Sequence, residues 1–359
     1  MLQTVHLSAL LADEALVEIH ATGICHTDLS CMNGTLPTAT PAVLGHEGAG
    51  IVVEVGSGVT HVAKGDKVLL SVNYCQTCPS CVAGHPNFCD EALPRNFGGR
   101  RVADGSATVS ILDDGGARVD CYSVFFGQSS FASHAVVNRA CMVKVPVETP
   151  LELFAPLGCG VLTGVGSILN TLDVKEGSSV AVFGVGNVGL SAVMAARIRN
   201  ARVIVAIDLD ERRLELAKTL GATHTVDGSS EDVVAQVKKW SPQGAGVAYA
   251  ADCTGSPRVI ANMLECLAVR GRAAQVGVAA PDQTVPVKIL QHLLRGQEYV
   301  GCAGGDALPS ALLPWIMEQQ QRGRFPLEKL ISYYDVQDFA RAFEDAKSGS
   351  AIKPVLRWR

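Results

Sequence analysis

The stretch Val180-Ala-Val-Phe-Gly184-Val-Gly186-Asn187-Val188-Gly189 decides the fold of much of this 359-residue chain. It is a G-x-G-x-x-G motif that directly follows an apolar strand and opens a helix. Gly184 permits a tight turn, Gly186 lets the backbone approach a pyrophosphate, and Gly189 lets helix and strand pack closely. The helix N-terminus then faces the phosphates. The loop residues expected to contact a dinucleotide are Gly184, Gly186, Asn187, Val188 and Gly189.

The rest of this region repeats a rhythm of strand, glycine turn and helix. Glu211 to Leu220, for example, has a helical pattern that Gly221 ends. Six strands joined by helices predict a doubly wound parallel sheet. The expected strands are 180–183, 203–207, 223–226, 247–251, 272–276 and 298–301.

Asp208 favours NAD over NADP as the cofactor. It closes the second strand, 19 residues beyond Gly189. A carboxylate there can accept hydrogen bonds from the adenosine ribose hydroxyls and would repel a 2′-phosphate. Arg212 and Arg213 leave NADP open as an alternative, because nearby guanidinium groups can bind a phosphate.

The chain before this region has a different character. Between residues 16 and 80, short β-like runs alternate with glycine turns, which is typical of an antiparallel, barrel-like unit. A helix near 308–322 and the tail 352–358 are expected to return to it. The sequence therefore predicts an α/β protein of two domains. We expect one domain to comprise residues 1–160 and 304–359, and the dinucleotide-binding domain to comprise residues 161–303.

Four cysteines within 15 residues indicate a metal site in the first domain. Cys75, Cys78, Cys81 and Cys89 follow the spacing C-x2-C-x2-C-x7-C. Four thiolates match the tetrahedral shell of a structural zinc, and the turn formers between them suit a loop folded round an ion. The alternatives are buried free thiols or two disulfides. Such a lobe indicates a zinc protein but says nothing of an enzyme.

Composition narrows the class of partner. The net charge is −5 and no basic run occurs, so we expect no nucleic-acid or anionic-membrane partner. The first twenty residues lack a cationic segment and a clean apolar core, so we do not expect them to be a signal peptide. Gly, Pro or charge breaks each apolar run before it reaches membrane-spanning length. We expect a cytoplasmic, reducing location in which clustered thiols bind metal.

Cys25, His46 and Cys159 remain in short glycine-flanked motifs. They span 134 residues, so spacing alone does not show that they meet. A Cys2His metal site and inert, separately buried side chains both stay open on this ground.

The order of motifs resembles that of the zinc-containing medium-chain alcohol dehydrogenases, whose catalytic domain is GroES-like. Asn96-Phe-Gly-Gly and Phe125-Phe-Gly-Gln-Ser-Ser-Phe131 look most like the aryl (benzyl) alcohol dehydrogenase branch. The motifs that carry the family resemblance are Gly23-Ile-Cys25-His-Thr-Asp28, Gly45-His46-Glu47, the four-cysteine lobe, Gly158-Cys159-Gly160 and Gly184-Val-Gly-Asn-Val-Gly189.

The resemblance implies a catalytic zinc on Cys25, His46 and Cys159, with a fourth position left for substrate. Asp28 would orient His46, and Glu47 would lie behind the metal. The further implied roles are a proton relay through Thr27, contacts of His26 and Lys353 with the pyrophosphate, and a place for Arg213 near the adenosine ribose. Several members carry a histidine where this chain has Ser30, so His26, water or another group would take over the outer end of the relay.

The implied protein is an NAD-dependent enzyme with two zinc ions per chain, one catalytic and one structural. It would interconvert primary alcohols, aryl or allylic, and aldehydes, and would form a homo-oligomer, either dimer or tetramer. Family members usually carry more β structure ahead of the segment where this chain starts. The alternatives are an NADP-linked aldehyde reductase and a non-enzymatic, zinc-stabilised NAD-binding protein.

Overall fold

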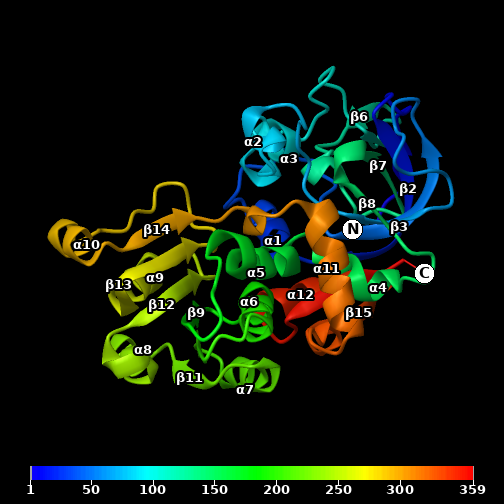
Figure 1. Ribbon diagram of the computed structural model, residues 1–359. Coiled ribbons are helices and arrows are strands. Elements are labelled where there is room, and N and C mark those ends of the chain that lie inside the picture. The colour runs from blue at the N-terminus through cyan, green and yellow to red at the C-terminus, as the bar shows by residue number, and fades with distance from the viewer. Residues whose placement is uncertain (1, 359) are drawn as a thin grey trace. The chain divides into compact units, whose positions relative to one another are not determined.

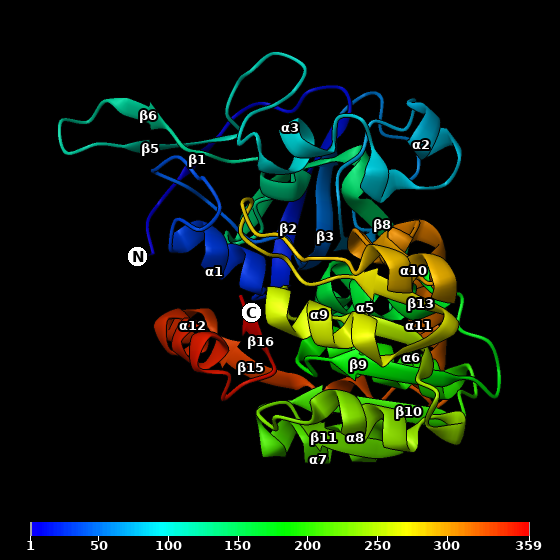
Figure 2. The same ribbon diagram turned by 90° about the vertical axis from the view of Figure 1, so that its left-hand side faces the viewer.

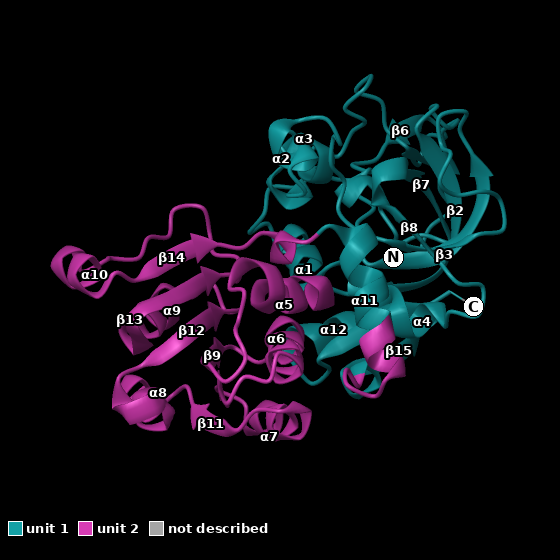
Figure 3. Cartoon of the chain, viewed as in Figure 1, with its two compact units in different colours: residues 1–159, 308–317, 327–359 teal, residues 160–307, 318–326 magenta. Residues whose placement is uncertain are grey.

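The computed structural model describes residues 2–358, which divide into two compact units. Unit 1 comprises residues 1–159, 308–317 and 327–359, and unit 2 comprises 160–307 and 318–326 (Figure 3).

A six-stranded parallel sheet forms the centre of unit 2, in the order β11-β10-β9-β12-β13-β14 (Figure 1). The order reverses between β9 and β12, as in a doubly wound dinucleotide-binding sheet. The predicted fold class is confirmed. The strands are β9 (Ser179–Phe183), β10 (Val203–Asp208), β11 (His224–Asp227), β12 (Val247–Asp252), β13 (Leu267–Gln275) and β14 (Glu298–Gly301).

Helices flank this sheet, and each follows from its local sequence. Asp210 caps the predicted helix 211–220 by accepting a hydrogen bond from Arg212 N, and Gly221 ends that helix. Helices α8 and α9 cover one face of the sheet (Figure 2). Val237 of α8 and Met263 of α9 belong to the same buried apolar cluster as Phe183 of β9. The helices are α5 (Gly160–Gly166), α6 (Asn187–Ile198), α7 (Glu211–Leu220), α8 (Val233–Trp240), α9 (Pro257–Cys266) and α10 (Ile289–Arg295), with a π-helical turn at Ser167–Thr171.

Unit 1 is built on a mainly antiparallel seven-stranded sheet, in the order β15-β16-β2-β3-β4-β8 with β7 also paired to β2. Apolar side chains alternate along β2, so Ala15, Val17 and Ile19 enter the core. A second sheet has the order β1-β5-β6. The strands are β1 (His6–Leu7), β2 (Glu14–Gly23), β3 (Gly48–Val55), β4 (Lys67–Leu70), β5 (Val109–Leu112), β6 (Arg118–Asp120), β7 (His134–Asn138), β8 (Met142–Val145), β15 (Ile331–Asp335) and β16 (Lys353–Arg357).

Short helices join these strands. The C-terminal strand β16 pairs with β2, which is how the expected return of the tail to the first unit is built. The helices are α1 (His26–Met32), α2 (Pro79–Val82), α3 (Ala92–Phe97), α4 (Leu151–Phe154), α11 (Pro309–Gln321) and α12 (Phe339–Ser348).

One stretch departs from the expected division of the chain. Residues 318–326, the end of α11 and the turn after it, group with unit 2 and not with the C-terminal part of unit 1. The physical reason is local packing, because Gly323 and Arg324 line a hollow together with Ile198 of α6.

No single described helix is long and apolar enough to cross a membrane. One bent pair, Leu151–Gly158 with Gly160–Thr171, passes on length and composition together, and nearly all of its residues are buried in the protein.

Candidate functional site

Four metal-binding side chains meet in unit 1. The donor atoms of Cys25, His46, Glu47 and Cys159 all lie within 4.8 Å of one another. Cys25 caps the N-terminus of α1, His46 and Glu47 precede β3, and Cys159 follows a short helical turn at Ala155–Gly158. The structure therefore brings together residues whose sequence spacing left the question open.

Hydrogen bonds fix the orientation of His46. Its Nδ1 lies 3.1 Å from Asp28 Oδ1, and both side chains are buried. Nδ1 therefore donates to the carboxylate, which leaves Nε2 as the acceptor. Nε2 is buried and has no hydrogen-bond partner. A buried nitrogen lone pair beside two thiols fits a metal ligand.

Neighbouring groups shift the pKa values of the two cysteines and the histidine of this cluster. A hydrogen bond with Cys159 lowers the pKa of Cys25 well below its usual value, and the same bond raises the pKa of Cys159. Burial opposes a charge on His46, but the nearby charges of Asp28 and Cys25 raise its pKa overall. Two thiols and an imidazole are the donor set of a catalytic zinc site, which leaves a fourth position for substrate.

Lys353 lies where the sequence did not place it. Its Nζ is buried and donates to both carboxylate oxygens of Glu47, at 2.9 and 2.8 Å, and to Ile24 O at 3.0 Å. The expected contact of Lys353 with a pyrophosphate stays a prediction. β16 carries this lysine into the interior of unit 1, where it pairs with the carboxylate next to a metal ligand.

Gln128 is a site residue that the sequence did not reveal. Its Nε2 donates to His46 O at 3.0 Å and to Ser71 O at 3.1 Å, while its Oε1 accepts from Gly48 N at 3.1 Å. It thereby ties the His46 backbone to two neighbouring segments. No spacing pattern marks a buried glutamine of this kind.

Aromatic side chains form a wall beside His46. The Phe126 ring stacks on the imidazole, with centroids 4.5 Å apart and planes inclined by 21°. Phe97 meets Phe126 edge to face at 5.0 Å. Phe126 and Phe97 are partly exposed, whereas Phe125 is completely buried, so only Phe125 is a pure core residue.

The expected relay residues lie around Cys25. Thr27 Oγ1 is 3.7 Å from Cys25 Sγ and is half-buried. His26 is exposed at the first position of α1, and Ser30 lies one turn further on. Among these three expected relay residues, Thr27 has its hydroxyl in contact with a donor atom of the cluster.

The cysteine lobe forms a second group of donors in unit 1. The four sulfur atoms of Cys75, Cys78, Cys81 and Cys89 lie within 4.8 Å of one another. Backbone N–H groups point at them, and a hydrogen bond from Thr77 is the main cause that lowers the pKa of Cys75 to about 6. All twelve cysteines are free thiols, which removes the disulfide alternative. The donor set fits a structural zinc.

The glycine loop of unit 2 has the geometry that a dinucleotide needs. Gly184 has φ +83°, and a Cβ on Gly189 would lie 1.9 Å from Gly184 O, so neither position accepts a side chain. A Cβ on Gly186 would meet open space. Both polar atoms of the Asn187 side chain are buried without a hydrogen-bond partner, which fits a side chain that hydrogen-bonds to a bound ligand.

Asp208 lies beside this loop. Its Oδ2 accepts a hydrogen bond from Val185 N at 2.7 Å, and its Oδ1 accepts one from Asp210 N at 3.0 Å. Arg213 approaches the same carboxylate at 3.9 Å. Asp208 therefore both shapes the loop and keeps acceptor capacity for a ribose.

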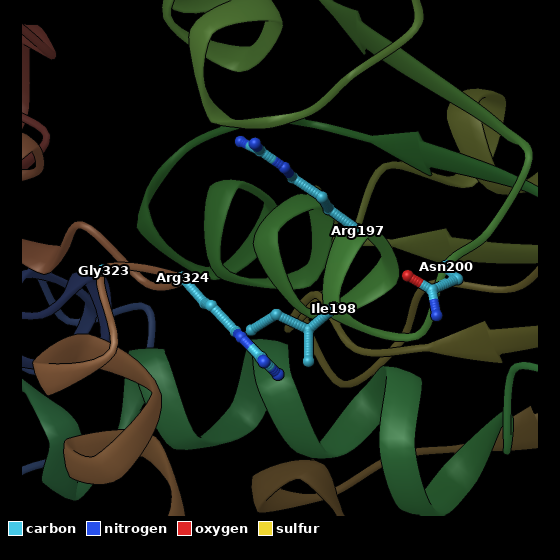
Figure 4. A pocket seen from close by; sticks show the side chains of 5 residues that line it. All are labelled: Arg197, Ile198, Asn200, Gly323 and Arg324. Carbon is cyan, nitrogen blue, oxygen red and sulfur yellow. The ribbon is translucent and has the colours of Figure 1, made fainter.

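The hollow shown in Figure 4 is separate from the glycine loop. Arg197, Ile198 and Asn200 line it at the C-terminal end of α6, together with Gly323 and Arg324. Asn187 begins the same helix, so the hollow lies roughly 16 Å from the glycine loop at 1.5 Å per residue. The side chains of Arg197 and Arg324 extend in different directions (Figure 4). It is not the cofactor site.

Comparison with known proteins bears on both units. The family described as "Alcohol dehydrogenase GroES-like domain" matches residues 11–147, and "Zinc-binding dehydrogenase" matches 187–318.

Three relatives extend this match to nearly the whole chain. A geraniol dehydrogenase of Castellaniella defragrans is 41% identical and covers 99% of this chain and 93% of its own. An S-(hydroxymethyl)glutathione dehydrogenase of Synechocystis is 37% identical, covering 96% and 92%. The crystal structure of benzyl alcohol dehydrogenase from Acinetobacter calcoaceticus superposes with a TM-score of 0.93 at 37% identity, covering 99% and 94%.

Proposed function

The chain belongs to the zinc-containing medium-chain alcohol dehydrogenases, and on that premise we propose that it oxidises primary aryl or allylic alcohols with NAD⁺ in a reversible reaction. That it is an oxidoreductase interconverting alcohols and aldehydes follows from the family; the cofactor, the substrate class and the residue roles are our proposal.

The unpartnered Nε2 of His46 carries the proposal. It faces the thiols of Cys25 and Cys159, and the Asp28 carboxylate holds it in the ligating tautomer. We infer that these three residues hold the catalytic zinc. When bound, the zinc supplies a Lewis acid and the nicotinamide supplies a hydride acceptor.

The chain's own residues then handle the proton. Thr27 Oγ1 lies beside Cys25 Sγ, and a hydroxyl can accept one proton while it donates another. We infer that Thr27 takes the proton of the substrate hydroxyl and passes it outward. His26 is exposed one residue away and suits the outer end of the relay. Asp28 and Gln128 hold His46 still during the reaction.

The aromatic wall supports the substrate class. Phe126 and Phe97 present partly exposed rings beside the cluster. Flat, unsaturated carbon next to a hydroxyl-bearing carbon packs on such rings better than a saturated chain does. The geraniol and benzyl alcohol dehydrogenases among the relatives act on allylic and aryl alcohols by their names, in keeping with this wall.

The carboxylate of Asp208 supports NAD as the cofactor. It sits at the end of β10 beside the glycine loop and is largely buried, so a 2′-phosphate there would meet a charge of the same sign. The approach of Arg213 to the same carboxylate reduces its capacity to serve a phosphate instead.

Three further proposals concern the whole protein. We infer two zinc ions per chain, because both donor groups have complete ligand sets. We infer a homo-oligomer, supported by the exposed apolar side chains of α10, Ile289, Leu290, Leu293 and Leu294. A cytoplasmic location is supported by twelve free thiols.

NADH absorbance during turnover of the purified protein tests the proposal. The panel contains benzyl alcohol, an allylic terpene alcohol, a saturated alcohol of equal length and S-(hydroxymethyl)glutathione, each with NAD⁺ and NADP⁺. We expect the highest kcat/KM for the aryl and allylic alcohols with NAD⁺. A preference for the glutathione adduct or for NADP⁺ would contradict the substrate or the cofactor assignment, and no turnover with any alcohol would contradict both.

A further inference from the structure

Asp252 is a completely buried carboxylate at the end of β12 in unit 2. Its Oδ1 accepts hydrogen bonds from Thr254 Oγ1 at 2.6 Å and Thr254 N at 3.2 Å. Its Oδ2 accepts from Gly255 N at 2.9 Å and Gln275 Nε2 at 3.2 Å. All four donors are uncharged. Both carboxylate oxygens are therefore held by hydrogen bonds, and none of these bonds comes from a cation.

The carboxylate of Asp252 contributes to the pKa shifts of two neighbouring side chains. Burial, followed by the charge of Asp252, raises the pKa of both Cys253 and Tyr299. A buried carboxylate without a cationic partner is unfavourable unless a positive charge arrives. The four hydrogen bonds hold the Asp252 carboxylate in place without neutralising its negative charge, so a positively charged ligand group nearby would be attracted to it.

Asp252 and Asp208 lie on opposite sides of β9, because Asp252 ends β12 and Asp208 ends β10. β12 and β10 flank β9, and Asp252 and Ile207 are both register partners of Phe183, the residue before Gly184. In a sheet of this order a dinucleotide bridges the reversal point between β9 and β12. Asp208, on the β10 side, is the group expected at the adenosine ribose. The nicotinamide half therefore falls on the β12 side.

The loops at this position pack tightly against one another. A Cβ on Gly184 would lie 2.6 Å from Thr254 Cγ2, and one on Gly277 would lie 2.1 Å from Gly255 N. The turn that Asp252 holds is thus wedged between the phosphate loop and the loop after β13. The electrostatic effect of the Asp252 carboxylate therefore reaches the cofactor edge of the sheet through the protein interior, where water does not screen it.

We propose that Asp252 is a fixed anion on the nicotinamide side of the cofactor site, where it favours the positively charged ring of NAD⁺ over the neutral ring of NADH. This inference rests on the proposed use of NAD. It adds that the chain sets the relative affinity of the two redox forms with a charge outside the metal cluster.

Dissociation constants of NAD⁺, NADH and ADP-ribose for Asp252→Asn test the inference. ADP-ribose lacks the nicotinamide and reports whether the loop is intact. We expect the ratio of the NAD⁺ to the NADH dissociation constant to rise about tenfold, the effect of one unit charge acting over roughly 12 Å at an effective dielectric constant of about 20. ADP-ribose affinity should stay within about twofold of the parent, since the nicotinamide is the part that senses the charge.

Three variants separate charge from geometry. Thr254→Val removes a hydrogen bond to Asp252 but keeps the charge, so the ratio should not change. Gln275→Lys places a cation beside the carboxylate and should raise the ratio even if Asp252→Asn folds poorly. Asp227→Asn is the matched control, because Asp227 ends β11 and holds Ser229 in the same kind of turn but is exposed.

Equal weakening of NAD⁺ and NADH in Asp252→Asn and Gln275→Lys would overturn the inference and leave Asp252 a structural residue. An unchanged ratio in both variants would overturn it as well. A parent protein that binds neither dinucleotide would instead overturn the proposed function itself.

Discussion

The phenyl ring of Phe126 lies flat against the imidazole of His46, with centroids 4.5 Å apart. Phe126 keeps this place with a left-handed backbone, φ 51°, in a segment where Val124 and Ser129 are also left-handed. Non-glycine residues hold such angles at a cost of order 1–3 kcal/mol each only where the surroundings determine them. Here Ser129 Oγ donates to Val43 O and accepts from Phe125 N. The segment is built to present one aromatic face beside the donor cluster.

Substitution of this ring should change substrate preference. Phe126→Leu removes an aromatic face worth about 0.5–1.5 kcal/mol, so kcat/KM for benzyl alcohol should fall roughly 2- to 10-fold relative to a saturated alcohol. Phe88→Leu, at an exposed phenylalanine of the cysteine lobe, is the control. Equal losses on both alcohols in Phe126→Leu would show that the ring only supports the fold.

The proton relay should depend on Thr27 far more than on Ser30. Thr27→Val keeps the shape and removes the hydroxyl, so hydride transfer in single turnovers should slow by roughly 10²–10⁴-fold. NADH affinity should stay at the parent value. Ser30→Ala, one turn along the same helix, should have little effect. A parent-like rate in Thr27→Val would mean that water deprotonates the alcohol directly.

Alanine substitutions at two glycines of the dinucleotide loop should affect different properties, one the stability of the protein and the other the binding of NADH. A methyl group at position 189 collides with Gly184 O, so Gly189→Ala should lower the melting temperature. A methyl group at position 186 meets open space, so Gly186→Ala should keep the melting temperature and weaken NADH binding. If Gly186→Ala bound NADH as the parent does, the pyrophosphate would not pass this residue.

The structure also predicts a pH-dependent stability in unit 2. Burial lowers the pKa of His224, whose ring stacks on Trp240 with centroids 4.0 Å apart. The folded state therefore binds fewer protons than the unfolded state below the ordinary pKa of about 6.5. This histidine's contribution to stability should be lost as the pH falls below about 6.5.

His224→Phe keeps a stacked ring and removes the titration. The free energy of unfolding, measured by denaturant from pH 8 to 5.5, should fall less steeply in this variant than in the parent. Acid effects on the metal sites are common to both proteins and cancel in the difference. Parallel curves would contradict the assignment.

The sequence predicts unit 2 well because each signal there is local. Strand β10 was expected at 203–207 and spans Val203–Asp208, and the helix 211–220 begins after its cap and ends at Gly221 as expected. Strand β13 begins at Leu267, five residues before the expected start at 272, because it pairs with Val247 through a shift in register that no local pattern encodes.

The site in unit 1 is less accessible to sequence reasoning because its contacts are long-range. The meeting of Cys25, His46 and Cys159 followed from resemblance and not from spacing. Gln128 stands 82 residues from the His46 carbonyl that it binds, and Lys353 stands 306 residues from Glu47. Position in the chain says little about such partners. For this reason the sequence does not predict the ion pair of Lys353 with Glu47.

Zinc content, measured together with turnover and melting temperature in Cys159→Ser and Cys78→Ser, tests the central claim most directly. The account predicts two zinc ions per parent chain and one in each variant. Cys159→Ser should keep its melting temperature and lose turnover, whereas Cys78→Ser should lose stability first, because a structural zinc contributes directly to folding. Two zinc ions and parent-like turnover in Cys159→Ser would contradict the assignment of the catalytic metal to Cys25, His46 and Cys159.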